Sequence, residues 1–173
     1  GFLETSPRQG TVVADFHRNG TLDILVSIMS YNGGQLPREE IRSILEIRGV
    51  MMAFALESAI PNMTQEHIDE LAAQSEAFAH AKSAEEASQL IYEFDHMLSG
   101  FSNNTLLPLF FCSFKTPIKE LWRRYVTRNG VSILKQRNDQ LLECIARKDV
   151  ACAKRVIADS IAETISGRTE IYS

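Results

Sequence analysis

The feature that most constrains the fold is a row of apolar residues spaced three or four positions apart near the middle of the chain. The row is formed by Leu90, Ile91, Phe94, Leu98 and Phe101. This spacing is typical of an α-helix that buries one face. Asp95 borders the row, so we expect its carboxylate to point at or near the core. A carboxylate there has to be paired, neutralised or part of a polar site.

Helical spacing also covers the rest of the chain from Pro37 onward. Pro37 suits a first helical turn, and Ser83 with Glu86 has the pattern of a capping box. We expect Pro117 to bend one long helix. The predicted helices cover residues 37–60, 64–81, 83–101, 106–128, 131–147 and 150–165. With a short helix at residues 21–30, the pattern predicts an all-α antiparallel bundle of six or seven helices.

The N-terminal residues 1–16 differ from the rest. Two β-prone segments, 2–5 and 11–14, flank a turn-rich joint at 6–10, which predicts a short β-hairpin. Two strands alone are marginally stable. We therefore expect this hairpin to be the remnant of a neighbouring domain, and residues 17–36 to be a connector.

Composition bounds the remaining possibilities. A chain of 173 residues suffices for one well-buried domain, and its net charge of −4 argues against a main nucleic-acid-binding surface. No apolar run has the length of a membrane span, and no signal sequence is evident. We expect a cytoplasmic protein that does not bind a membrane. We expect Cys112, Cys144 and Cys152 to be buried thiols of a reducing compartment.

Four polar residues lie on or beside the apolar faces of four different predicted helices: Arg48, Asp95, Asn138 and Ser160. Four such residues, one on each helix, favour a polar pocket inside the bundle, where helical folds place ligands. The alternative is that they pair among themselves. An Arg48–Asp95 ion pair bridged by an amide would be purely structural.

The sequence indicates binding rather than catalysis. A serine nucleophile needs a nearby base, and no histidine falls on these faces. The HExxH, P-loop and glycine-rich fingerprints are all missing, so we expect neither an enzyme nor a bound cofactor. Hydrolysis by Asp95 and a water is the catalytic alternative that stays open.

A basic cluster interleaved with aromatic residues has two interpretations. Its members are Lys115, Lys119, Trp122, Arg123, Arg124, Tyr125 and Arg128. The cluster is either a solvated helix surface partly paired with Glu120 or a binding site for phosphates. Those phosphates would belong to a large anionic ligand such as a coenzyme A thioester, or to DNA approaching from the missing domain.

Several motifs resemble one family. GFLETSPRQGTVVADF is similar to the wing of a winged helix-turn-helix, and LEIRGVMMAFALESAI to the opening of the associated effector domain. EFDHMLSGFSNNTLL and LLECIARKDVACAKRVIADSI are similar to its central and closing helices. Together they resemble the FadR-type C-terminal effector (FCD) domain of GntR transcriptional regulators.

The resemblance implies a function for each part of the chain. Residues 1–16 would be the wing remnant, and residues 37–173 the effector-binding and dimerisation domain of a homodimer. DNA would bind through the missing N-terminal domain, and a small organic acid or acyl-CoA would bind the pocket. Arg48 would anchor the acid, and Tyr125 and Asn104 would join the ligand-binding residues. A ligand-free helical adaptor or dimerisation module is the alternative.

The chain departs from the family at the positions of its metal ligands. Many members hold a divalent metal through an aspartate and three histidines. Counted from Asn104, the aspartate position is Ile91, and the histidine positions are Asp95, Asn138 and Ser160. If Asp95 is taken as the aspartate instead, Ser99 stands one turn on, so neither register leaves a histidine. A site without imidazole or thiolate would bind such a metal weakly, so the resemblance implies a polar pocket without a metal.

Overall fold

The structure, a computed structural model, describes residues 3–6, 10–13, 24, 26, 27, 29, 36–167 and 171. The chain divides into two units, residues 1–36 and 37–173. In the first unit, strand β1 (Leu3–Ser6) pairs antiparallel with β2 (Gly10–Val13), and Leu3 lies opposite Val13. The predicted hairpin is therefore present, with both strands shifted by one residue. The described residues 24, 26, 27 and 29 are helical, inside the range predicted for the short helix.

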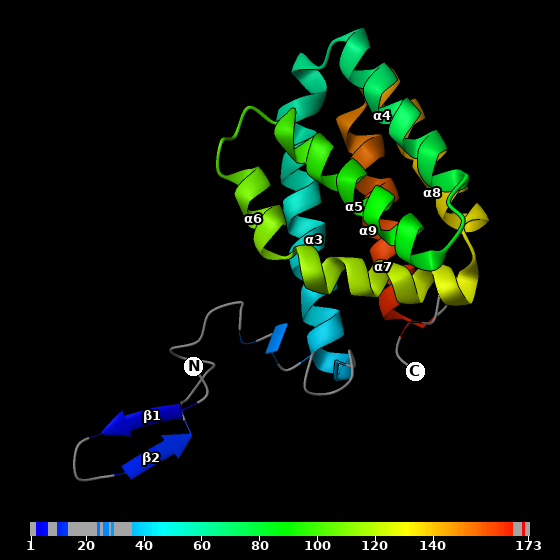
Figure 1. The fold of residues 1–173 in the computed structure, drawn as a ribbon. Coiled ribbons are helices and arrows are strands. Elements are labelled where there is room, and N and C mark those ends of the chain that lie inside the picture. Colours follow the sequence, from blue (N-terminus) through cyan, green and yellow to red (C-terminus); the bar gives the residue numbers. More distant parts are fainter. Residues whose placement is uncertain are drawn as a thin grey trace. The chain divides into compact units, whose positions relative to one another are not determined.

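The described part of the second unit contains seven α-helices and one turn of 3₁₀-helix, η1 (Figure 1). The α-helices are α3 (Arg38–Ala59), α4 (Gln65–Ala79), α5 (Ala84–Gly100), α6 (Leu107–Ser113), α7 (Lys115–Asn129), α8 (Ser132–Ala146) and α9 (Val150–Ile165), and η1 spans Ile60–Asn62. The all-α bundle is confirmed. None of the described helices is long and apolar enough to cross a membrane.

Side-chain caps fix where several helices begin. The Thr64 and Ser83 hydroxyls accept hydrogen bonds from backbone N–H groups of the first turns of α4 and α5. Asp149 does the same at the start of α9, where its carboxylate accepts from the Cys152 N–H at 2.9 Å. Each cap satisfies a donor that the helix itself leaves without a partner.

The predicted bend at Pro117 is instead a complete break, located at Phe114 between α6 and α7. Proline has no N–H to bond to the carbonyl of the residue four positions earlier, here Ser113. The break therefore falls at the preceding turn, and Pro117 lies buried in the first turn of α7. The sequence correctly marks the interruption but misplaces it by three residues.

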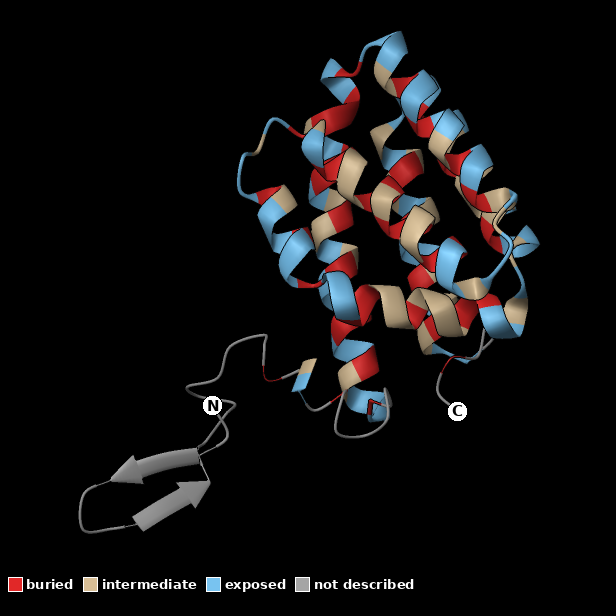
Figure 2. Cartoon of the chain, in the orientation of Figure 1, coloured by how far each residue is buried: buried red, intermediate tan, exposed pale blue. Residues whose placement is uncertain are grey.

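Helix α5 lies at the centre of the packing. It contacts α3, α4, α6 and α7, while α9 contacts α3 and α8 (Figure 1). Buried and exposed residues alternate along the helices in a pattern that gives most helices one buried and one exposed face (Figure 2). Helices α3 and α9 approach closely at Gly49, where an added Cβ would lie 2.9 Å from Ile161 Cδ1.

The expectation of three buried thiols is wrong. Cys144, near the end of α8, is bonded to Cys152, in the first turn of α9, as a disulfide. Cys112 is a free thiol, but it is exposed on α6. The sequence spacing of eight residues does not itself indicate pairing, because only the sharp turn between the two helices brings the sulfur atoms together.

Two neighbouring phenylalanines of α6 provide a test of this packing. The Phe111 side chain is 0% exposed and that of Phe110 is 56% exposed. We expect Phe111→Ala to lower the free energy of unfolding by about 3–5 kcal/mol, because it leaves a cavity in the core. Phe110→Ala, the matched control, should cost less than about 1 kcal/mol. Equal losses in urea unfolding would contradict the assigned orientation of α6.

Candidate functional site

A buried ion pair joins the centres of α3 and α5. The Arg48 Nε and Nη2 atoms donate to Asp95 Oδ2 at 2.9 and 2.7 Å. Both residues are almost fully buried, Arg48 at 6% and Asp95 at 2% exposure. The Arg48 guanidinium also lies over the Trp122 ring of α7, 4.6 Å from its centroid. The arginine is thus held by an acid on one helix and an aromatic face on another.

Two opposing effects act on the Asp95 carboxyl. Burial raises the pKa of Asp95, because the charged form loses its water. The Arg48 charge and hydrogen bonds oppose that rise in the pKa, and the nearby Trp122 N–H acts in the same direction as Arg48. Trp122 Nε1 nevertheless does not meet hydrogen-bond geometry with any described partner.

The four residues singled out in the sequence line one cavity of about 30 Å³. Arg48 comes from α3, Asp95 from α5, Asn138 from α8 and Ser160 from α9. Trp122 and Arg137 line the same cavity, and aliphatic side chains of α8 and α9 complete its wall. Arg48 and Asp95 are buried, whereas Asn138 and Ser160 are half-buried.

A second, mainly apolar cavity of about 20 Å³ adjoins the first. The two cavities share Arg48, Trp122 and Ser160, and Tyr125 lines only the second. Each has room for a water molecule or two. Asn104 lines neither cavity. Its Oδ1 instead accepts hydrogen bonds from the Leu106 and Leu107 N–H groups, both at 3.0 Å, at the start of α6.

Arg137 is the site residue that the sequence analysis missed. Its Nη1 donates to the Tyr125 hydroxyl at 2.9 Å and to Ser160 Oγ at 3.3 Å. Its Nη2 pairs with Glu163, whose side chain is 39% exposed. The spacing contained a signal, because residues 137 and 138 both fall on the helical face between Leu134 and Leu141. Arginines are usually exposed, so the sequence pattern by itself favours Asn138 over Arg137 as the residue that faces the core.

Two buried donors of the cavity wall have no hydrogen-bond partner among the described residues. They are Trp122 Nε1 and Asn138 Nδ2. Buried donors are rarely left without an acceptor, so each such case calls for a water, an ion or a ligand. The lining of the cavity is therefore rich in hydrogen-bond donors: it contains two guanidinium groups, an indole and an amide, but only one carboxylate, that of Asp95.

The donor set does not fit the divalent metal of related domains. The positions that the resemblance equates with the family's histidines hold a carboxylate already engaged by Arg48, an amide and a hydroxyl. Transition metals such as zinc prefer imidazole or thiolate ligands. Within the described residues, no three His, Cys, Asp or Glu side chains are grouped to hold a metal ion.

The basic cluster on α7 is largely paired. Lys119 bonds to Glu85 at 3.1 Å, and Arg123 and Arg124 both bind Glu120, at 2.7 and 2.9 Å. Lys115 lies over the Tyr92 ring. These contacts favour the interpretation of a solvated, partly paired helix surface.

The burial of the Arg48–Asp95 pair predicts how the free energy of unfolding responds to loss of the carboxylate. Asp95→Ala leaves the Arg48 charge buried without a partner, and we expect the free energy of unfolding to fall by about 3–5 kcal/mol. The control is Glu46→Ala in the exposed Arg42–Glu46 pair, which should change it by no more than about 0.5 kcal/mol. Urea unfolding measures both, and equal effects would contradict the burial of the Arg48–Asp95 pair.

Solved structures of similar fold come from bacterial regulators. A GntR family transcriptional regulator from Pseudomonas syringae pv. tomato str. DC3000 aligns with a TM-score of 0.62 and 16% identity over 97% of this chain and 63% of that one. Streptococcus agalactiae GntR aligns with a TM-score of 0.64 and 15% identity over 96% of this chain and 75% of that one. A third structure is that of Lar, described as controlling the expression of the Listeria monocytogenes agr system and mediating virulence. It aligns with a TM-score of 0.68 and 13% identity over 98% of this chain and 74% of that one.

At these identities the structural likeness shows the fold alone. The chain spans less than two thirds of the Pseudomonas regulator. No match was found among curated proteins. The model of the FCD domain, in contrast, matches residues 43–163, which is well over half of the sequence. The chain therefore belongs to the FCD domain family, a family of regulatory effector-binding domains rather than enzymes.

Proposed function

We propose that this chain is the effector domain of a cytoplasmic GntR-type transcription regulator and binds a small organic acid without a metal. DNA binding would belong to a winged-helix domain ending in the hairpin at residues 1–16. The observation that carries the proposal is the pair of buried donors, Trp122 Nε1 and Asn138 Nδ2, beside two arginines in one cavity. A ligand carboxylate would add acceptor oxygens beside these donors, because the one carboxylate of the lining, Asp95, is already engaged by Arg48.

Arg137 is a better anchor for the acid than Arg48. Arg48 already binds Asp95 through two nitrogen atoms and is covered by Trp122. Arg137 instead pairs with Glu163, which is partly solvated and lines neither cavity. A ligand carboxylate would replace Glu163 at the guanidinium, while Asn138 and Ser160 hydrogen-bond its other polar atoms.

A small acid would require less opening of the two cavities than an acyl-CoA. Cavities of about 30 and 20 Å³ hold water but no effector, so binding requires the shared wall of Arg48, Trp122 and Ser160 to move. A ligand that binds only the opened arrangement shifts the population toward it. The shift would change the spacing of two DNA-binding domains and thereby alter operator affinity.

The homodimer is part of the same proposal, because regulators of this kind read two-fold operators. Helix α3 offers a surface for it. Ile47, Val50 and Phe54 follow one another at helical spacing and are 45%, 72% and 46% exposed. Such a row on an outer face favours contact with a second copy.

One observation favours the adaptor as a second candidate. The Arg48–Asp95 pair is satisfied within the protein, and the space beside it is small. In a ligand-free adaptor these polar groups would only fix the helix register. A thermal-shift screen of organic acids separates the two candidates, since a ligand that binds the folded state raises the melting temperature with concentration.

The decisive variant for the acid is Arg137→Gln. Loss of a charged hydrogen bond costs about 1.5–3 kcal/mol, so we expect the affinity for a carboxylate found in the screen to fall by about 10- to 100-fold in calorimetry. Arg123→Gln is the matched control, because Arg123 lies on α7, is paired with Glu120 and lines neither cavity. Unchanged affinity in Arg137→Gln would remove Arg137 from the site, and a screen without any stabilising acid would favour the adaptor.

Sedimentation velocity tests the dimer. We expect the protein to sediment as a dimer and Val50→Glu to sediment as a monomer, because a charge at the centre of an apolar interface loses its water without gaining a partner. Glu46→Gln, one turn away and exposed, should leave the dimer intact. A wild-type protein that is monomeric at high concentration would contradict the proposal for this chain.

A further inference from the structure

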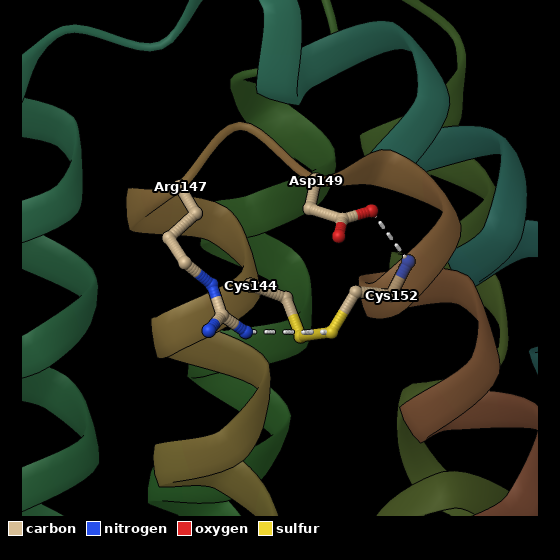
Figure 3. Close-up of a disulfide and its surroundings, with 4 residues drawn as sticks. All are labelled: Cys144, Arg147, Asp149 and Cys152. Atoms are coloured by element: carbon tan, nitrogen blue, oxygen red, sulfur yellow. Dashed lines mark hydrogen bonds between the residues drawn. A yellow bond between two sulfur atoms is a disulfide. The ribbon is translucent and has the colours of Figure 1, made fainter.

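We propose that Cys144 and Cys152 form a reversible oxidation site that reacts with peroxides. The disulfide ties the last turn of α8 to the first turn of α9 (Figure 3). In cytosolic proteins disulfides are usually transient and serve catalysis or redox sensing. The inference therefore rests on the cytoplasmic location proposed above, but not on the identity of the effector.

Contacts other than the bond itself also hold the two cysteines close together. Their Cα atoms lie 5.6 Å apart. Lys148 adopts a left-handed conformation with φ 57°, and the Asp149 N–H donates to the Cys144 carbonyl at 2.9 Å. The Lys148 ammonium donates to the Ile60 carbonyl at 3.0 Å and also to that of Met63. Since these contacts hold the turn, two thiols at this place remain within reach of each other.

The surroundings assign different roles to the two sulfur atoms. Arg147 Nη2 lies 3.8 Å from Cys152 Sγ, and Cys152 is the third residue of α9 (Figure 3). A cationic group and the N–H groups of a helix start both stabilise a thiolate, although the Asp149 carboxylate beside them opposes this. Cys152 is half-buried, whereas Cys144 is 2% exposed. We infer that Cys152 reacts first and Cys144 second.

The chemistry is that of a two-cysteine peroxide reaction. The Cys152 thiolate attacks one peroxide oxygen, the O–O bond breaks, and the second oxygen leaves as an alcohol or water after taking up a proton. This step forms a sulfenic acid on Cys152. The Cys144 sulfur then attacks the Cys152 sulfur and displaces hydroxide, which leaves as water with the proton of Cys144. Two thiols and one peroxide thus give the disulfide, one alcohol and one water, and a dithiol reverses the change by exchange.

The site lies one helical turn from the polar cavity. Leu141 precedes Cys144 by three residues and Val156 follows Cys152 by four, and both line the cavity. The bond therefore joins the two helices that carry Arg137, Asn138 and Ser160. Its formation restricts the movement of α9, which carries Ser160 of the wall shared by the two cavities, relative to α8.

The first experiment counts thiols in Cys112→Ser protein, which removes the exposed third thiol. We expect the reduced protein to lose both thiols on treatment with hydrogen peroxide, with a mass decrease of about 2 Da, and to regain them with dithiothreitol under native conditions. Thiols that survive the peroxide would overturn the proposal. A bond that dithiothreitol opens only after unfolding would also overturn it, because such a disulfide is structural.

The second experiment assigns the reacting sulfur. In the Cys112→Ser background, Cys144→Ser leaves only Cys152, and Cys152→Ser leaves only Cys144. With peroxide and dimedone, which traps sulfenic acids, we expect Cys152 to be labelled at least about tenfold faster than Cys144. Equal or reversed labelling would overturn the order of reaction. Arg147→Gln should slow the labelling of Cys152 several-fold, and an unchanged rate would overturn the role of Arg147.

Discussion

The structure depends on one buried charge pair, Arg48–Asp95, which joins α3 to α5 at the centre of the bundle. A buried ion pair contributes little net stability, because removing both charges from water costs about as much as their attraction returns. It does fix the two helices in register, since any shift would leave one charge without its partner. The pair also introduces charged groups into an apolar core, and α8 and α9 place the polar side chains of Arg137, Asn138 and Ser160 around the same cavity.

The consequence is a cavity rich in donors and short of acceptors. Arg48 is satisfied by Asp95, but the Trp122 and Asn138 N–H groups are not satisfied by any described residue, and Arg137 relies on a partly solvated glutamate. The charge that would fit this cavity is negative. The Cys144–Cys152 bond joins the end of α8, which carries Arg137 and Asn138, to the start of α9, which carries Ser160. Effector binding and thiol oxidation would therefore act on the same pair of helices.

Much of the fold could be predicted from the sequence, because helical periodicity, caps and proline positions are local. The convergence of Arg48, Asp95, Asn138 and Ser160 could be anticipated because each interrupts an apolar face. The sequence also offers the Arg48–Asp95 pair as one of two alternatives, but it does not decide between that pair and a free arginine, and it does not place the other partners. Whether Arg48 is available to a ligand depends on its distance from Asp95, and the role of Arg137 depends on Tyr125 and Ser160 of other helices. The disulfide depends on the turn at Lys148, and the void volume on how all the side chains pack.

Trp122 makes the central claim directly measurable, because it is the only tryptophan of the chain and lies in the wall shared by both cavities. Its indole N–H gives a single resonance in a ¹H–¹⁵N spectrum. If a small organic acid occupies this site, titration with an acid that stabilises the protein will move that resonance saturably, with the same affinity as in calorimetry. A stabilising acid that leaves the Trp122 resonance in place would contradict the account, because the ligand would then bind elsewhere.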